Sequence, residues 1–430
     1  MSRHILAMVA ALGLLAASTQ VKGDDLGKLL DRATRNGIRQ AIVPRNSGPQ
    51  PGNPRGAAVD PRRAATENRI AGGEPVVTKT RDGWNLVAQH FRPVGQPKAG
   101  AMPVILCHGL TYNAQFWDLD PSCGFAQYLA GLGYDVWAVD LRGSGMSQKW
   151  VWRLEDAPEV LIGGALRRMS QGKLGTASYA SVDPKYANWN MDHHIAMDVP
   201  ALVQMVRRRT GAPAVAWVGH SMGGIVALAC LARYENPGIG CLVTVGSQVT
   251  MPEGQVARQF LTEMLQTRSR QLAGELTGEQ IVSQTRTSVY NLFFNEQNVS
   301  PKVYEALSGW ATDIPAIGLM QQYMLLSNKG VLLDAKGQFN YAQAIGNVKV
   351  PIFISCGQRD NFAPPRVQKF LFDHVGSTDK TLYIFGRAQG LPVDAGHDDA
   401  LVGLNSKATS YPVIARWLEA HVQAQPPQAP

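Results

Sequence analysis

Short apolar runs alternate with amphipathic stretches along most of the chain. Each run is bounded by turn residues, which is typical of buried parallel strands, and the stretches between them have helical periodicity. The runs fall at residues 102–109, 134–140, 214–220, 241–247, 351–357 and 381–386. Residues 74–93 add two alternating segments around Arg81, Asp82 and Gly83, a pattern that predicts a hairpin at the sheet edge. We predict an α/β fold with a mostly parallel eight-stranded sheet and helices on both faces.

The same pattern divides the chain into regions. The strand-rich core spans 74–250 and 348–423, while residues 251–347, here called the cap, carry helical patterns such as those at 254–274 and 317–330. A structureless loop of that length inside a compact domain is improbable, so we expect a helical cap insertion over the active site. Residues 148–188 are also too long for a simple crossover, and we expect them to be the cap's neighbour. Residues 424–430 should be a disordered tail.

The N-terminus has the pattern of a secretory signal. A short basic start precedes an apolar run from Ile5 to Ala17 and then small residues, so we expect cleavage near residue 23 and a secreted or periplasmic protein. An anchoring helix is the alternative, but the run is shorter than the roughly 20 residues that a bilayer span requires. Residues 24–73 are polar and rich in Arg, Pro and Gly, which predicts a flexible leader.

The net charge of +8 does not indicate a nucleic-acid partner. Much of the excess lies in the leader, where arginines occur without the interleaved aromatic residues of a single-strand binding surface. The leader leaves open a loose contact with an anionic envelope surface, or it is simply solvated.

The five cysteines do not form a metal-binding pattern. Four occupy positions where free core thiols are expected, namely Cys107, Cys230, Cys241 and Cys356. Cys123 lies in a loop-like stretch and is expected to be available. We expect neither a metal nor a cofactor.

A glycine-bracketed serine interrupts the apolar run that ends near residue 220. Gly219 and Gly223 stand two positions before and after Ser221. Small residues are needed there when a strand turns sharply into a helix and holds the serine strained and exposed at the tip. The stretch therefore predicts a nucleophile elbow.

A serine nucleophile needs a base and an acid that orients the base. Asp360 directly follows an apolar strand, and His397 lies in the loop after the last strand. The chain order Ser221, Asp360, His397 is the one expected of an α/β-hydrolase. Three other acids near the histidine are rivals of Asp360, and we expect none of them to reach the inner ring nitrogen: Asp394, Asp398 and Asp399.

The oxyanion formed when a serine attacks a carbonyl carbon needs two backbone donors. Met222, the residue after the serine, supplies one, and Leu110 in the turn after the first core strand supplies the other. Other histidines have structural interpretations. His108 is expected to brace the turn of Leu110, and His220 to support the elbow. His193 and His194 are alternative metal ligands, but adjacent residues diverge on a helix.

These motifs resemble the α/β-hydrolase superfamily across about residues 74–422. Residues 140–147, "DLRGSGMS", resemble that superfamily's D-x-R-G-x-G-x-S turn, and the segments "HGLTYNAQFWD" and "VGHSMGG" are similar to the acid (gastric-type) lipases. The chain departs from those lipases where they have N-S-R-G, and its cap matches only loosely. The resemblance implies the fold and the triad, and it does not extend to triglyceride specificity. The cap also resembles polyhydroxyalkanoate synthases, which use a cysteine nucleophile, whereas Ser221 favours hydrolysis.

We therefore expect an exported serine carboxylic-ester hydrolase acting on a small-molecule or lipid-like ester. A proline-type aminopeptidase, a thioesterase and a perhydrolase would use the same triad, and a catalytically silent binding protein would share only the fold. A peptidase would need acidic cap residues to hold an amine, for which Glu263, Glu275 and Glu279 are the candidates. The cap residues that could line an acyl pocket, or simply pack the cap, are Tyr290, Phe293, Phe294, Trp310, Met320, Tyr323 and Met324.

Overall fold

Eight strands form a single sheet in the computed structural model of the chain. The structure describes residues 73–149, 189–251, 260–263, 266, 292–308, 310–313 and 315–422. The strands lie in the order β1-β2-β4-β3-β5-β6-β7-β8. Their bounds are β1 Glu74–Lys79, β2 Asn85–Phe91, β3 Val104–Cys107, β4 Val136–Asp140, β5 Val215–His220, β6 Ile239–Val245, β7 Ile352–Gly357 and β8 Lys380–Phe385.

The sheet is parallel except at one edge. β1 and β2 pair antiparallel, and β2 pairs antiparallel with β4, whereas every pair from β4 to β8 is parallel. The mostly parallel eight-stranded sheet and its edge hairpin are thus confirmed. β3 lies between β4 and β5, so the chain passes to one side of β3 to form β4 and then crosses to the other side to form β5. Open parallel sheets bind ligands at such switch points in strand order.

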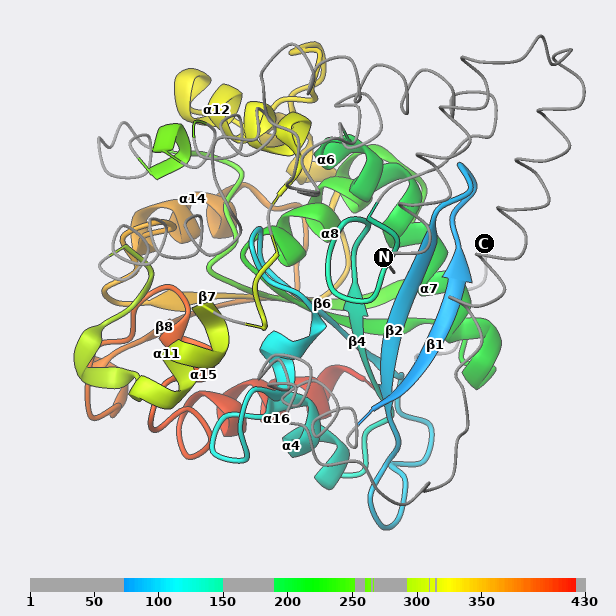
Figure 1. Ribbon diagram of the computed structural model, residues 1–430, viewed down its shortest axis with the longest axis vertical. Coiled ribbons are helices and arrows are strands. Elements are labelled where there is room, and N and C mark those ends of the chain that lie inside the picture. Colours follow the sequence, from blue (N-terminus) through cyan, green and yellow to red (C-terminus); the bar gives the residue numbers. More distant parts are fainter. Residues whose placement is uncertain are drawn as a thin grey trace, which may run out of the picture. The chain divides into compact units, whose positions relative to one another are not determined.

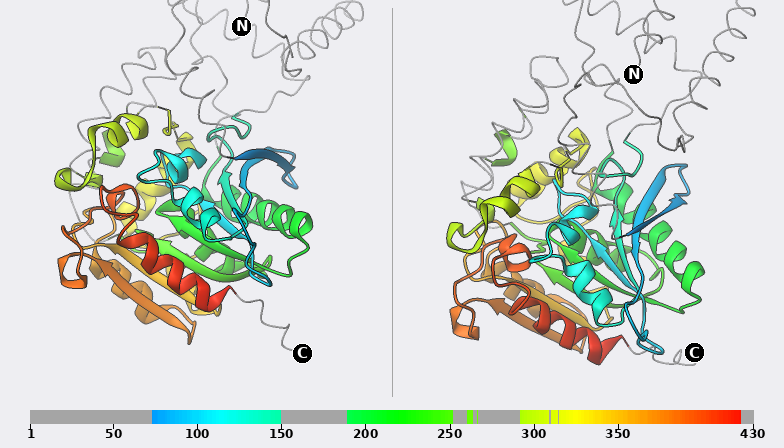
Figure 2. Two further views of the ribbon diagram at one scale, coloured as in Figure 1. Left: turned by 90° about the horizontal axis from the view of Figure 1, so that it is seen from below. Right: turned by 60° about the horizontal axis from the view of Figure 1, so that its bottom comes forward.

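Helices cover both faces of the sheet (Figure 1). α4 (Phe125–Gly131) and α16 (Ser410–His421) pack together on one face, while α7 (Val199–Thr210), α8 (Met222–Arg233) and α14 (Pro365–His374) cover the other. Figure 2 shows the same two layers from below. The remaining helical elements are η1 Ala114–Asp118, α6 Met191–His193, η5 His194–Asp198, η6 Glu296–Asn298, α11 Pro301–Ser308, α12 Ile317–Lys329, α13 Tyr341–Ala344, η7 Ile345–Asn347, η8 Arg387–Gln389 and α15 Asp399–Val402.

Hydrophobic burial explains the central elements. All residues of β3, β4 and β5 are buried, which fits strands covered by helices on both sides. The residues of α8 are buried from Met222 to Ala232, so this helix lies inside the protein rather than on its surface. α7 ends at Gly211, whose φ of 73° is the left-handed cap that glycine adopts without steric cost.

The described part of the predicted cap consists of helices joined by turns and a few isolated β-bridges. It contains α11, α12 and the short elements from residue 341 to 347. α13 and η7 pack against α8, so the last residues of this segment contact the core directly. The division of the chain into core and cap remains a prediction, as do the signal, leader and tail, because residues 1–72 and 423–430 lie outside the described residues.

One prediction about the cysteines is wrong. Cys123 is 1% exposed, because its turn belongs to the hydrophobic core of the protein. All five cysteines are buried free thiols. Among the described helices, none is both long enough and apolar enough to span a bilayer.

Candidate active site

Ser221 lies on the turn between β5 and α8. Its φ is 50° and its ψ is −118°, and no other described non-glycine residue has a positive φ. Such a conformation costs about 1–3 kcal/mol and persists only when the surroundings fix it. The Ser221 amide donates to the carbonyl oxygen of Val245 at 2.8 Å, and the Ser247 hydroxyl donates to the Ser221 carbonyl oxygen at 2.8 Å. The end of β6 therefore holds the strained serine.

The two bracketing glycines are sterically required. A Cβ on Gly223 would lie 2.1 Å from the carbonyl oxygen of Cys107, at the end of β3, and a Cβ on Gly219 would lie 2.2 Å from the backbone nitrogen of Gly224. Both collisions are with backbone atoms, which cannot rotate away. The elbow can therefore form only with glycine at these two positions.

We expect Gly223→Ala to lower the free energy of unfolding by about 3 kcal/mol or more, because the added methyl group overpacks the β3–α8 contact. Urea denaturation would measure the change. The control is Gly131→Ala in α4, where a Cβ meets nothing within 4 Å and alanine is the better helix former. Equal stability of the two variants would contradict the tight elbow.

His397 and Asp360 face each other at the carboxyl edge of the sheet. His397 Nδ1 lies 2.8 Å from Asp360 Oδ2, and the other carboxylate oxygen accepts from the amides of Phe362 and Ala363 at 2.9 and 2.6 Å. Burial alone would lower the pKa of His397, but the charge of Asp360 and its hydrogen bond outweigh burial and raise it. The pair can therefore accept a proton at Nε2 and hold the imidazolium that results.

His397 Nε2 is buried and has no hydrogen-bond partner among the described residues. This is the nitrogen that a base would turn toward a serine, and in proteins without substrate such contacts are often long. Gly246, which follows β6, has a φ of 67°, and a Cβ there would lie 2.9 Å from the His397 ring. Since the residue before Gly246 accepts the Ser221 amide, the histidine ring and the serine lie beside the same strand end.

The rival acids have other partners. Asp394 Oδ1 accepts from the amide of Arg387 at 2.8 Å. Asp399 accepts from the amide of Gly396 at 2.9 Å and from the Asn298 side chain at 2.6 Å. Asp398 bonds to a tyrosine, as described below. Asp360 is thus the acid that bonds to His397 Nδ1 in the described part of the chain.

Two backbone amides are available as oxyanion donors. Leu110 follows the end of β3, and Met222 is the first residue of α8, where helix geometry leaves the amide without an intrahelical acceptor. Neither amide donates to an acceptor among the described residues. A Cβ on Gly109 would lie 3.4 Å from Ser221 Cβ. The turn that carries Leu110 therefore approaches the serine closely.

His108 and Asp140 brace this turn. His108 Nδ1 bonds to the carbonyl oxygen of Gly109 at 2.8 Å, while Nε2 accepts from the Leu141 amide at 3.3 Å. Burial lowers the pKa of His108 to about 4, so the ring is neutral and has one donor and one acceptor, as these bonds require. Asp140 Oδ1 accepts from the amide of Ala114 at 2.7 Å. The predicted bracing role of His108 fits these contacts.

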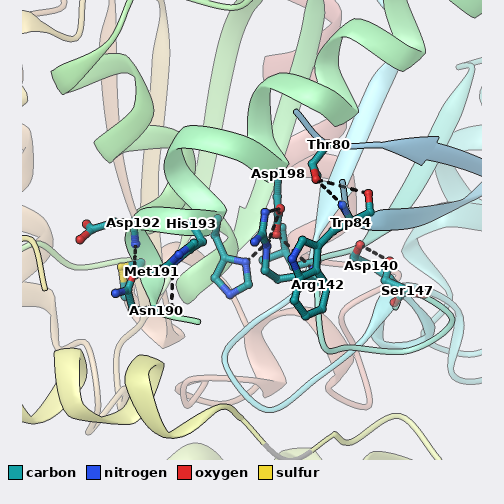
Figure 3. Close-up of polar contacts among 12 residues, drawn as sticks. Thr80, Trp84, Asp140, Arg142, Ser147, Asn190, Met191, Asp192, His193 and Asp198 are labelled. Carbon is teal, nitrogen blue, oxygen red and sulfur yellow. Dashed lines mark hydrogen bonds and ion pairs between the residues drawn. The ribbon is translucent and has the colours of Figure 1, made fainter. Parts of the chain in front are cut away.

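Arg142 ties the loop after β4 to two other segments. Its guanidinium bonds to Asp82 at 2.7 and 3.0 Å and to Asp198 at 2.7 and 2.9 Å, and Figure 3 shows Asp198 beside Arg142, with Asp140 bonded to Ser147 nearby. Arg142 is only 1% exposed. The pair with Asp82 is bidentate, and Nε and Nη2 both donate to Oδ1 of Asp198. Four charge-assisted hydrogen bonds thus satisfy the buried guanidinium, which explains why the loop carries an arginine.

Aromatic rings surround His397. The rings of Phe293 and Phe362 each lie 5.2 Å from the His397 ring in edge-on arrangement, and Phe260 lies 5.0 Å from Phe293. All three phenylalanines are buried. The wall beside the histidine is therefore apolar.

The other histidines considered as metal ligands, His193 and His194, have structural contacts. His193 bonds to the Asn190 side chain and His194 to Asp198, each at 2.8 Å, so the two rings have separate partners. Among the described residues, one group could hold a metal ion, His220, His397 and Asp398, with donor atoms within 4.8 Å of one another. His397 Nδ1 is bonded to Asp360, His220 Nε2 to the carbonyl oxygen of His397 and Asp398 Oδ2 to the hydroxyl of Tyr112.

Sequence reasoning missed several residues at the site. Phe260 and Phe362 were not singled out, and Gly246 carried no motif. Its positive φ and its approach to His397 depend on how β6 and the histidine loop meet, which no local pattern encodes. Of the predicted cap residues, Tyr290 lies outside the described residues, Phe294 packs on Tyr304, and Met320 and Tyr323 are buried in the protein interior.

Comparison with known proteins identifies the family. The model of the alpha/beta hydrolase fold matches residues 102–403, well over half of the chain. The chain belongs to this family. Within it, the protein is similar to lipases and esterases. Lipase member K of Homo sapiens is 23% identical over 286 residues, which is 64% of both chains. Gastric triacylglycerol lipase of Bos taurus is 29% identical over 149 residues, 34% of this chain and 31% of that protein.

The curated matches are partial and the structural matches are broad. The chain covers only 27% of the tear acid lipase-like protein of Mesocricetus auratus and 26% of Lipase 1 of Drosophila melanogaster. An esterase from Exiguobacterium antarcticum superposes with a TM-score of 0.53 at 14% identity, covering 80% of this chain and all of that one (100%). A thermophilic esterase from Thermogutta terrifontis superposes with a TM-score of 0.50 at 17% identity, covering 81% of this chain and 99% of that one. These structures support the fold.

Proposed function

We propose that the protein is an exported serine hydrolase that cleaves carboxylic esters through an acyl-enzyme. The observation that carries the proposal is the pair formed by His397 and Asp360, 2.8 Å apart, beside a serine held at a φ of 50°. A strained, positive-φ serine that precedes a buried helix is the arrangement of a nucleophile elbow. The similarity to lipases and esterases supports the same chemistry.

The proposed reaction has two halves. Ser221 Oγ attacks the ester carbonyl carbon while His397 Nε2 takes the hydroxyl proton, and the amides of Leu110 and Met222 stabilise the oxyanion. The carbon–oxygen bond to the alcohol then breaks, and His397 gives its proton to the leaving oxygen. Water then attacks the acyl carbon while His397 takes its proton, the bond from that carbon to Ser221 Oγ breaks, and His397 returns the proton to Ser221 as the acid leaves. Asp360 holds the imidazole throughout and keeps its charge.

A fluorophosphonate probe tests the proposal directly. We expect covalent labelling of Ser221 by the probe, together with turnover of nitrophenyl esters that exceeds turnover of a thioester and of an aminoacyl anilide. A protein that binds the esters without labelling or turnover would be a silent binding protein of this fold. Preferred turnover of the anilide would identify a peptidase. A mature chain beginning near residue 24 would support export.

The apolar wall beside His397 favours a substrate with an apolar acyl or alcohol group. We expect Phe293→Ala to lower kcat/KM for long-chain nitrophenyl esters roughly tenfold relative to the acetate ester, because a buried aromatic contact contributes on this scale. Phe294→Ala is the matched control, since its ring packs on Tyr304 at 5.9 Å instead of on His397. Equal losses on all esters, in step with thermal stability, would assign Phe293 to packing alone.

A further inference from the structure

A second buried acid lies directly beside the catalytic histidine. Asp398 follows His397 in the chain and is fully buried. Its Oδ2 accepts a hydrogen bond of 2.5 Å from the hydroxyl of Tyr112. Tyr112 stands two residues after Leu110, in the turn that supplies the oxyanion donor. This hydrogen bond therefore joins the oxyanion turn to the histidine loop.

The other oxygen of Asp398 faces the elbow. Asp398 Oδ1 lies 3.3 Å from His220 Nε2 and has no hydrogen-bond donor among the described residues. His220 Nε2 bonds instead to the carbonyl oxygen of His397, also at 3.3 Å. Because His220 immediately precedes Ser221, the elbow, the histidine loop and the oxyanion turn meet around one carboxyl group.

The groups around Asp398 determine the pH at which it becomes charged. Burial raises the pKa of Asp398 to about 7, and the charge of His397 and the hydrogen bond from Tyr112 act in the opposite direction, while Asp399 and Asp360 raise it further. Burial and the nearby charge of His397 hold the pKa of His220 well below its ordinary value, so His220 is neutral. The Tyr112 hydroxyl is thus the donor that favours a charged Asp398.

Asp398 in turn affects the pKa of His397. The charge of Asp398 helps to raise the pKa of His397, after the larger effect of Asp360. An imidazolium forms at His397 each time the ring accepts a proton from serine or water, and a second carboxylate nearby stabilises that cation. Asp398 itself takes no proton from the substrate in this role.

We propose that Asp398, held by Tyr112, is a second anionic positioning residue of the active site, which aligns the histidine loop with the oxyanion turn and supports the positive charge on His397. This inference rests on the proposed ester hydrolysis. Asp360 holds the ring by Nδ1, whereas Asp398 acts through charge and through the loop that it anchors.

The pH profile of kcat/KM tests the charge. Catalysis needs neutral His397, so the acid limb of the profile reports its pKa. We expect Asp398→Asn to move this limb to lower pH by about one unit and to lower kcat about tenfold, with KM for an acetate ester unchanged. Tyr112→Phe should act in the same direction, because loss of the Tyr112 hydrogen bond raises the pKa of Asp398 further and leaves less of the carboxylate charged at a given pH.

A double-mutant cycle separates this role from simple packing. In the Asp398→Asn background, Tyr112→Phe should have little further effect, since the hydroxyl acts through the carboxylate. Tyr411→Phe, which removes a buried hydroxyl without a partner in the described residues, and Asp394→Asn are the matched controls and should leave the acid limb in place. An unmoved acid limb, with additive losses that follow thermal stability, would overturn the proposal.

Labelling by the fluorophosphonate distinguishes the two levels of failure. If every variant is labelled at Ser221 and the acid limb does not move, the role of Asp398 is wrong and the proposed hydrolysis stands. If the unaltered protein is not labelled, the proposed function itself fails. Tyr112→Phe keeps the aromatic ring and its packing, so it provides the test should Asp398→Asn not fold.

Discussion

Ser221→Ala should abolish ester turnover, with a loss on the order of 10⁶ in kcat, and should remove labelling by the fluorophosphonate. The reason is that no other group at the elbow can form the acyl-enzyme. The backbone strain stays, since alanine meets the same positive φ as serine, and the Ser221 hydroxyl is used in none of the bonds that hold the turn. The thermal midpoint should therefore remain that of the unaltered protein, as measured by calorimetry.

Ser377→Ala is the matched control for this experiment. Ser377 is also a buried serine, but it lies just before β8, and its hydroxyl donates to the carbonyl oxygen of Asp379 at 2.9 Å. The amino ends of the strands face away from the elbow, so the control should retain full turnover. Near-normal activity of Ser221→Ala would contradict the serine mechanism, regardless of the roles of His397 and Asp360.

Asp360→Asn should lower kcat by roughly 10² to 10⁴. Asparagine fits the same space and can still accept the amides of Phe362 and Ala363. Its NH₂ group, however, would donate to His397 Nδ1, so the ring would carry its proton on Nε2, where it cannot accept one from serine. Loss of the carboxylate also removes the main influence that raises the pKa of His397, so residual activity should extend to lower pH.

The comparison with Asp394→Asn makes the test specific. Asp394 lies in the histidine loop but bonds to the amide of Arg387, so its change should cost far less activity. Steady-state kinetics and circular dichroism of both variants would separate catalysis from folding. If Asp360→Asn stayed active while Asp394→Asn lost comparable activity, the acid would be misassigned, and Ser221 and His397 would still stand.

Local patterns determined the fold class and the positions of the candidate triad. Strand runs bounded by turn residues have a short-range cause, the burial of consecutive residues in a parallel sheet, and so they can be read from the chain directly. Gly219 and Gly223 are equally local, because a tight turn needs small residues at fixed spacing. The order of Ser221, Asp360 and His397 follows from which strand ends carry polar residues.

Contacts between distant strand ends could not be read from the sequence. Gly246 is required because β6 delivers it against His397, and Tyr112 bonds to Asp398 across 286 positions of the chain. The loop-like sequence around Cys123 predicts an available thiol, but the hydrophobic core buries it.

A mostly parallel α/β sheet, an elbow serine and two polar partners after later strands are thus predictable from the chain alone, since each depends on residues a few positions apart. The rings that surround His397 and the loops that share Asp398 are evident only in the folded protein. Those contacts are set by side chains that meet across the sheet edge, where the distance along the chain carries no information about the distance in space.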